Sequence, residues 1–370
     1  MRIVKVENNS DLMRFIKFPW KIYSGNKNWV PNLIPEYKFI LTKNPFWEHA
    51  KQALFLAVDD RNKIVGRVAG IIDYNYINFH QEPVGFFGFF ESINDREVAR
   101  QLLEAVMDFH RRNNLKITRG PTNPSTNDEC GFLANDFDNP PRLMMPYNPP
   151  YYLNLLQDIG FNKVKELYAY DMDVSVGPIN RLEKLAEKTL ARLKEKVVIR
   201  PLNPKRFEAE IKIALKIYNA AWEKNWGFVP WTEKEFVTIA TRMKDLFVPE
   251  LTLLAEIGNE PVGMLIAVPD YNFVMQKMNG RLWPIGIFKF LYYKNKIQNL
   301  RLMIMGVIKE YRQRGIEGLM YLNALKTAMQ QGYKRCEFSW ILDDNIMTQR
   351  AAEMMGGKLY RRYFIYEKTI

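Results

Sequence analysis

A basic turn near the C-terminal end of the chain has the composition of an anion-binding site. Residues 311–315 (YRQRG) stand between an apolar run, 302–308, and a stretch with helical spacing that begins at Ile316. A strand that leads through a turn into a helix points successive N–H groups at one spot, where the helix dipole adds positive potential. Gly315 would let a ligand approach the backbone, and two arginines supply charge. The turn predicts a cradle for a phosphate-bearing ligand, although an ordinary surface turn that caps a helix has the same composition.

A second set of candidate groups lies in the first half of the chain. Glu91 ends a strand rich in phenylalanine, where partial burial would raise the pKa of the carboxyl group and suit it to act as a base. A structural glutamate paired with an arginine would have the same sequence context.

The long loop at 120–150 is rich in proline and asparagine, and loops of this length are frequently functional. It is a candidate substrate wall, and its polar groups are Asn123, Ser125, Asn127, Asp128, Tyr147 and Asn148, with Tyr151 and Tyr152 just beyond it. The candidate catalytic residues are Glu91, Tyr147 and Asn148.

The strand, turn and helix around residue 311 resemble the acyl-CoA pyrophosphate loop of the GNAT superfamily of N-acyltransferases. The usual pattern is Gln or Arg, two residues, Gly, one residue, and Gly or Ala. Arg312 and Gly315 fit this pattern, Glu317 occupies the second small position, and Gly318 follows one residue later. The resemblance implies that acyl-CoA binds here as a co-substrate, without a metal. The residues that it implies for CoA binding are Ile308, Tyr311, Arg312, Gln313, Arg314, Gly315, Ile316 and Gly318.

The order of predicted elements repeats along the chain. Val65-Gly66 aligns with Val262-Gly263, and Gly160 before one strand aligns with Gly356 before another. Two apolar hairpins with matching flanks indicate an internal duplication. We therefore expect an α/β (α+β) protein with two tandem GNAT-like domains, each a mixed, strongly twisted sheet flanked by helices.

The predicted boundaries follow from this repeat. Residues 1–172 form an N-terminal GNAT-like domain, 173–196 a helical linker, and 197–370 a C-terminal GNAT-like domain that carries the acyl-CoA loop. The corresponding loop of the first domain, 91–96, contains no glycine. CoA is therefore expected in the second domain only.

The segment 270–300 is an insertion into the second half, and it combines aromatic and aliphatic residues with interleaved lysines. Such a composition suits a helix that lies in a membrane interface or covers a lipid tail. A helix packed on its own domain would look similar.

Composition sets further limits. The chain has a formal net charge of +12, two cysteines and three scattered histidines. The charge favours an anionic partner, which could be CoA, an anionic membrane surface or nucleic acid, and does not choose among them. Of these partners nucleic acid is not the one expected, and no metal site is expected. No signal peptide is recognisable, and no window reaches the roughly 18 apolar residues of a membrane span. We expect a cytoplasmic protein with a peripheral contact at the inner membrane face through 270–300.

The chemistry implied by the resemblance is transfer of an acyl group from CoA to an amine, which attacks the thioester directly. The tandem layout also resembles bacterial ceramide-synthase-type acyltransferases, which would make the acceptor a lipid or sphingoid amine. Two alternatives stay open: a Fem-type aminoacyl-tRNA-dependent transferase, and a catalytically silent CoA- or lipid-binding protein of the same fold. The sequence does not determine the acceptor, the acyl length, the base and acid, or the oligomeric state.

Overall fold

The computed structural model describes residues 1–193 and 195–370, which form two compact units. Unit 1 comprises Met1–Leu167, Asn272–Tyr293 and Arg361–Ile370, and unit 2 comprises Tyr168–Tyr271 and Lys294–Tyr360. The predicted boundaries at 172 and 197 stay a prediction, and the predicted linker contains Lys194, which lies outside the described residues. Most of the 270–300 insertion belongs to unit 1, and Asn279, just after its first helix, accepts a hydrogen bond from the Trp20 indole.

The sheet of unit 1 is built by consecutive strands. They are β1 (Arg2–Lys5), β2 (Ala50–Val58), β3 (Ile64–Asp73), β4 (Val84–Ser92) and β5 (Ile117–Gly120). Neighbours along this order pair antiparallel, except that β4 and β5 are parallel. The last residues of β15 (Lys358–Thr369) pair antiparallel with β5. Short strands within the long loop, β6 (Thr122–Asn123), β7 (Glu129–Cys130) and β8 (Phe132–Leu133), complete the unit.

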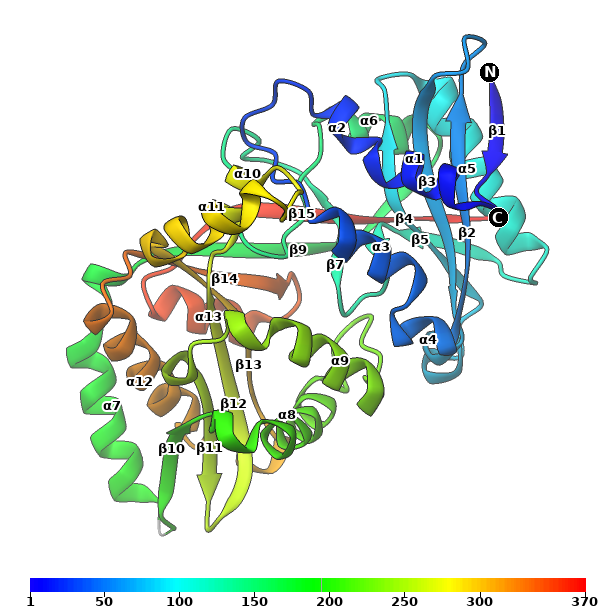
Figure 1. Cartoon of the computed structure of the whole chain (residues 1–370). Coiled ribbons are helices and arrows are strands. Elements are labelled where there is room, and N and C mark those ends of the chain that lie inside the picture. The colour runs from blue at the N-terminus through cyan, green and yellow to red at the C-terminus, as the bar shows by residue number, and fades with distance from the viewer. Residues whose placement is uncertain (194) are drawn as a thin grey trace. The chain divides into compact units, whose positions relative to one another are not determined.

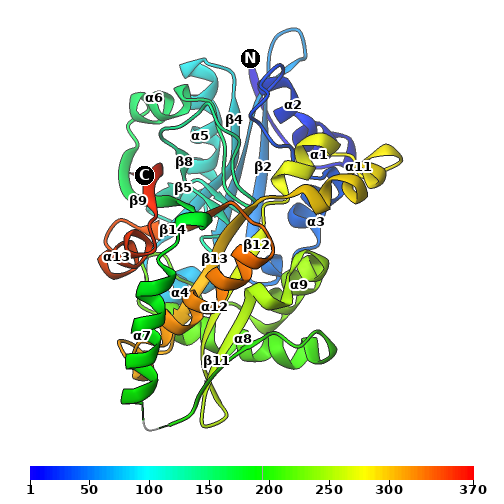
Figure 2. The same ribbon diagram turned by 90° about the vertical axis from the view of Figure 1, so that its left-hand side faces the viewer.

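Helices cover both faces of this sheet (Figure 2). On one side lie α5 (Arg96–Arg111) and α6 (Tyr151–Asp158), and on the other lie α1 (Asn9–Lys17), α2 (Pro19–Ile22), α3 (Ile34–Thr42) and α11 (Ile285–Tyr293). The Asp95 side chain caps α5 by accepting from the amides of Glu97 and Val98. Gly66 lets α5 approach β3, because a Cβ there would lie 2.5 Å from Leu102. Two further helices of unit 1 are α4 (Tyr74–His80) and α10 (Asn272–Met278).

Unit 2 repeats the same order of strands. They are β10 (Val197–Pro201), β11 (Thr252–Ile257), β12 (Glu260–Pro269), β13 (Asn299–Val307) and β14 (Arg335–Leu342). The first three pairings are antiparallel, and β13 with β14 is parallel. Helices α7 (Ile179–Arg192) and α12 (Ile316–Gln330) cover one face, and α8 (Phe207–Trp222) and α9 (Glu233–Met243) the other (Figure 1). The remaining elements are α13 (Ile346–Met354) and β9 (Asn162–Asp173), which begins in unit 1 and ends in unit 2.

The two units share their pairing register as well as their strand order. Gly66 of β3 pairs with Ser92 of β4, and Gly263 of β12 pairs with Val307 of β13. Each unit has its own apolar core, one around α5 and one around α12. The predicted α/β class and the predicted equivalence of the hairpins β2–β3 and β11–β12 are therefore confirmed.

In each unit the parallel pair of strands separates after a few residues. β4 pairs with β5 only over Val84–Phe86, and β13 pairs with β14 only over Asn299–Leu302. Beyond these points one edge of β4 and of β13 has no neighbouring strand from the parallel partner. We call these two openings the β4 split and the β13 split. Among the described residues, no helix combines the length and apolar character that a membrane span requires.

Candidate functional site

The β13 split is open along the second half of its strand. Residues 303–306 of β13 are only partly buried, although they lie within an apolar strand flanked by helices. Trp222, at the end of α8, closes one side, because a Cβ on Gly306 would lie 2.4 Å from its ring. A partly exposed backbone edge of an apolar strand is a surface on which an extended, amide-bearing ligand can add as a further strand.

The turn that follows β13 has the backbone form expected of an anion cradle. Gln313 and Gly315 both have positive φ angles, 60° and 89°. Within the part of the chain that the structure describes, the amides of Gln313, Arg314 and Gly315 have no hydrogen-bond partner. The amides of Ile316 to Gly318 begin α12, where a helix leaves its first N–H groups without intrahelical acceptors. Among the described residues, the predicted CoA-binding positions from Gln313 onward thus lie in one run of unpaired backbone donors. The amides of the earlier predicted residues, Ile308, Tyr311 and Arg312, are hydrogen-bonded to backbone carbonyls.

The two arginines of this loop have different roles in the structure. The Arg312 guanidinium donates to the carbonyls of Val307 at 2.9 Å and Ala221 at 2.6 Å, so it fixes the loop to β13 and α8. The Arg314 guanidinium stacks over the Tyr311 ring at 4.9 Å and is exposed. Arg314 is therefore the side chain that can bring charge to a ligand at this loop.

Packing against α7 explains both glycines of the motif. A Cβ on Gly315 would lie 2.2 Å from the Thr189 hydroxyl, and one on Gly318 would lie 2.8 Å from Leu185. The predicted reason for Gly315 was close approach of a ligand. The positive φ at Gly315 and the contact with Thr189 supply a local reason that does not need the ligand.

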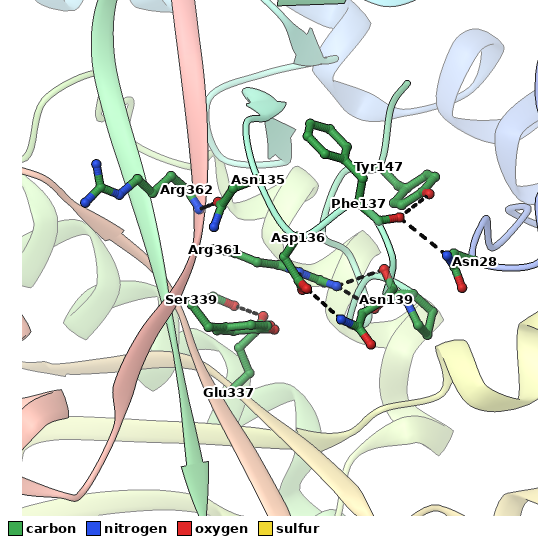
Figure 3. A network of polar contacts seen from close by, with 12 residues as sticks. Asn28, Asn135, Asp136, Phe137, Asn139, Tyr147, Glu337, Ser339, Arg361 and Arg362 are labelled. Carbon is green, nitrogen blue, oxygen red and sulfur yellow. Dashed lines mark hydrogen bonds and ion pairs between the residues drawn. The ribbon is translucent and has the colours of Figure 1, made fainter. Parts of the chain in front are cut away.

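A buried polar cluster closes the β13 split where the two strands separate. Arg301 pairs across the strands with Glu337 and donates to the Ser339 hydroxyl at 2.9 Å. The Ser339 and Tyr360 hydroxyls both donate to the Glu337 carboxylate, and Figure 3 shows the first of these contacts. The sequence analysis did not single out this cluster, although a charged residue within each of two apolar strands was a visible signal.

The β4 split contains the protein's own chain. Asn123 of β6 accepts from the Phe89 amide at 2.6 Å, and a Cβ on Gly88 would lie 1.7 Å from the Thr122 carbonyl oxygen. All of β4 is buried as a result. The loop after β4 also lacks the unpaired, glycine-bearing turn of unit 2. The expectation that CoA binds in the second domain only stays a prediction.

Unit 1 contains a polar cavity of about 80 Å³ instead, and Glu91 lies in its wall. The Glu91 Oε2 atom accepts from the hydroxyls of Tyr152 at 2.7 Å and Tyr23 at 3.0 Å. The buried Arg67 guanidinium lies 3.7 Å from Oε1. Burial raises the pKa of Glu91 to about 7, although Arg67 and the two tyrosine hydroxyls favour the charged form. A carboxyl group with such a pKa can exchange a proton near neutral pH.

Tyr147 and Asn148 line the same cavity, as does Asn123. The Tyr147 hydroxyl donates to the Phe137 carbonyl at 2.7 Å, and its own carbonyl accepts from Tyr23 at 3.1 Å. The Asn148 amide group bonds to both backbone groups of Leu133 and therefore holds β8. The structure thus brings together the three predicted catalytic residues, and their catalytic roles stay a prediction.

The long loop that carries these residues is fixed by a buried arginine from β15. The Arg361 guanidinium pairs with Asp136 at 2.7 Å and donates to the carbonyls of Asn139 and Pro140 (Figure 3). Tyr23 and Arg67, which complete the surroundings of Glu91, were absent from the sequence-based site. Arg67 was detectable as a charge within the apolar strand 64–73, but nothing in the sequence linked Tyr23 to it.

Comparison with known proteins finds relatives along the whole chain. The protein named bacterial ceramide synthase from Caulobacter vibrioides (strain NA1000 / CB15N) is 32% identical over 384 residues, which cover 100% of this chain and 98% of that protein. Protein YghO of Escherichia coli (strain K12) is 32% identical over 373 residues, 98% of this chain and 94% of that protein. No family model matches the chain.

Among solved structures, a tandem GNAT protein from the clavulanic acid biosynthesis pathway superposes with a TM-score of 0.58. It is 9% identical, and the match covers 100% of this chain and 98% of that chain. This likeness shows the fold. The expected tandem GNAT architecture is confirmed.

Proposed function

Because this chain belongs to the family of the Caulobacter bacterial ceramide synthase and YghO, we propose that it is an acyl-CoA-dependent N-acyltransferase. In this reaction the acceptor nitrogen attacks the thioester carbonyl, a C–N bond forms, and the C–S bond breaks. The nitrogen loses a proton to a base, and the CoA thiolate takes up a proton. The observation that carries the proposal is the open β13 split beside a loop of unpaired backbone amides.

We assign CoA to unit 2. The amides of Gln313 to Gly318 would donate to the pyrophosphate, with Arg314 adding charge from the loop surface. Ile308 and Tyr311 bound the loop, since Ile308 bonds to Val262 of β12 and the Tyr311 hydroxyl to Glu260. The free edge of β13 would take the amide-bearing arm of CoA.

We assign proton transfer from the acceptor to Glu91. A base with a pKa of about 7 is partly charged at neutral pH, and each of its two tyrosine hydrogen bonds favours the charged form. Tyr147 and Asn148 would shape the wall of the same cavity, Tyr147 with its phenol and Asn148 by holding β8 in place.

For the acceptor we favour a lipid amine of the sphingoid type, with a long-chain acyl-CoA as donor. The support is the name of the Caulobacter relative. Incubation with palmitoyl-CoA and a sphingoid amine should give the N-acyl product by mass spectrometry, faster than acetyl-CoA gives its product. If the protein instead prefers acetyl-CoA and a small amine, the assignment of a lipid amine as acceptor is wrong. Transfer from charged tRNA would support the Fem-type alternative, and CoA binding without turnover would indicate a silent binding protein.

The CoA assignment is tested by reversing charge at matching loops of the two units. Arg314→Glu should weaken CoA binding in calorimetry by about tenfold or more, because it replaces an attractive charge by a repulsive one near phosphate. Arg96→Glu, at the exposed first residue of α5 just beyond the loop after β4, is the matched control and should leave the affinity unchanged. Gly315 is a poor test position, because a side chain there would also disturb Thr189. An equal loss of CoA affinity in Arg314→Glu and Arg96→Glu would refute the assignment of CoA to the loop of unit 2. The absence of CoA binding by the wild type would refute it as well.

A further inference from the structure

Helix α11 and the residues before it expose a row of large apolar side chains. Trp283, Ile285, Phe288, Leu291 and Tyr292 are each between 52% and 72% exposed. Ile285, Phe288 and Tyr292 recur at helical spacing, so they share one side of the helix. The opposite side contains Gly286, which is buried, and Phe290 and Tyr293, which are partly buried. This helix therefore has an inner face that packs and an outer face that is apolar and uncovered.

The outer face is held in place by the preceding segment. Asn279, just after α10, accepts from the Trp20 indole at 2.9 Å, and the Gly280 carbonyl accepts from the Ile34 amide at 3.0 Å. Asn272, at the start of α10, donates to the Pro141 carbonyl at 2.9 Å. Figure 2 shows α11 on the side of unit 1 that carries α1, α2 and α3. The apolar face thus projects from an anchored element.

The charges within this segment have one sign. Residues 271–298 contain no aspartate or glutamate. Within unit 1 the segment carries the exposed cations Lys277, Arg281 and Lys289, and the Lys289 ammonium donates to the Lys277 carbonyl. Exposed aromatic and aliphatic side chains among cations, without acids, are typical of a helix that lies in the interface of an anionic bilayer.

We propose that the outer face of α11 docks onto an anionic lipid bilayer. Trp283, Ile285, Phe288, Leu291 and Tyr292 enter the boundary between head groups and acyl chains, and Lys277 and Arg281 face lipid phosphates. A second copy of the chain is a poorer occupant of this face. Two copies would bring together cationic segments that contain no acidic residue, in a protein of net charge +12.

The test is flotation of the full-length protein with vesicles of equimolar phosphatidylcholine and phosphatidylglycerol. The wild type should float with these vesicles and should bind less to phosphatidylcholine alone. The double variant Ile285→Glu/Phe288→Glu should bind roughly tenfold more weakly or worse, because charged groups replace the two apolar contacts. Val176→Glu is the control, since Val176 is 75% exposed and lies in unit 2. Circular dichroism should show both variants folded.

A second measurement locates the contact. Brominated lipids should quench tryptophan fluorescence in the wild type, and Trp283→Phe should reduce that quenching without reducing flotation. Three results would overturn the proposal: no flotation of the wild type, equal flotation of the double variant, or concentration-dependent self-association that the double variant abolishes. None of these readouts depends on acyl transfer, so membrane docking and the proposed enzymatic function succeed or fail separately.

Discussion

The β4 split and the β13 split occupy the same place in the two units and have opposite contents. In unit 1, Arg67 of β3 pairs with Glu91 of β4, one residue away from the pair formed by Gly66 and Ser92. In unit 2, the corresponding pair next to Gly263 and Val307 is Met264 with Gly306. A buried ion pair in one unit thus stands where the other has a methionine and a glycine.

The aromatic side chain that covers each of these pairs also differs between the two units. Tyr23, just after α2, donates to Glu91, whereas Trp222, at the end of α8, packs on Gly306. The β4 split is filled by β6, while the β13 split has a partly exposed strand edge and a loop of unpaired amides. The two copies of one fold thus differ in what lies at the split. Unit 1 has a buried carboxyl group, Glu91, with its hydrogen-bond partners, and unit 2 has a partly exposed strand edge beside a loop of unpaired amides.

The largest effect is expected from removing the charge of Glu91, whose place in the pairing is taken by Gly306 in unit 2. Glu91→Gln should lower kcat by about a hundredfold or more, because general base catalysis contributes an effect of this order. The wild-type rate should fall as the pH is lowered through about 7, where Glu91 takes up a proton and can no longer accept one. Steady-state kinetics across pH would measure both effects.

Glu210→Gln is the matched control, because Glu210 is also buried and pairs with an arginine, Arg200, at 2.7 Å. It should lower thermal stability and leave the pH dependence of turnover unchanged. If Glu91→Gln retains turnover, or if the acidic limb of the profile persists in that variant, the assignment of chemistry to unit 1 is wrong.

A smaller effect is expected from changing the size of the side chain at matching positions of the two splits. Gly88 and Met303 each lie four residues after the first pair of the parallel strands. Gly88→Ala should lower the free energy of unfolding by about 3 kcal/mol, because its Cβ would overlap the Thr122 carbonyl at 1.7 Å. Met303→Ala should cost only about 1 kcal/mol, because Met303 is partly buried at an open edge. Urea unfolding would compare them, and equal losses would mean that the β13 split is as filled as the β4 split.

The sequence predicted the repeated elements well, because apolar runs and glycine or proline breaks report local structure directly. It made Glu91 a candidate because the preceding strand is aromatic, and the loop at 311–318 a candidate because its motif is contiguous; the functional roles of both stay predictions. It could not supply Tyr23 or Arg67, whose approach to Glu91 depends on tertiary packing. It also placed the segment 270–300 in the second domain, where chain order puts it. The bonds from Trp20 and Ile34, which tie that segment to unit 1, span about 250 residues and leave no local pattern.

The smallest effect is expected from removing one hydrogen bond to Glu91 while helix α6, which carries the donor, stays in place. The Tyr152 hydroxyl donates to Glu91 at 2.7 Å and so favours the charged carboxylate, whereas the hydroxyl of its neighbour Tyr151 donates to the Ser92 carbonyl. Tyr152→Phe should raise the pKa of Glu91 further. The acidic limb of the pH–rate profile should then move to higher pH, with the rate on the alkaline plateau changed less than the rate near pH 7.

Tyr151→Phe removes a hydroxyl from the same turn of α6 and should leave the limb in place. Tyr152→Phe also removes the acceptor of the Ser92 amide, so part of its effect is on stability, and the kinetics should be measured well below the unfolding temperature. If the acidic limb shifts equally in both variants, α6 affects the titration through its packing and not through the bond from Tyr152. A shift confined to Tyr152→Phe would identify the titrating group as Glu91, because Tyr152 bonds directly to that carboxylate. If the acidic limb of the pH–rate profile shifts in neither variant, the limb belongs to another residue. The assignment of proton transfer to Glu91 of unit 1 would then be wrong.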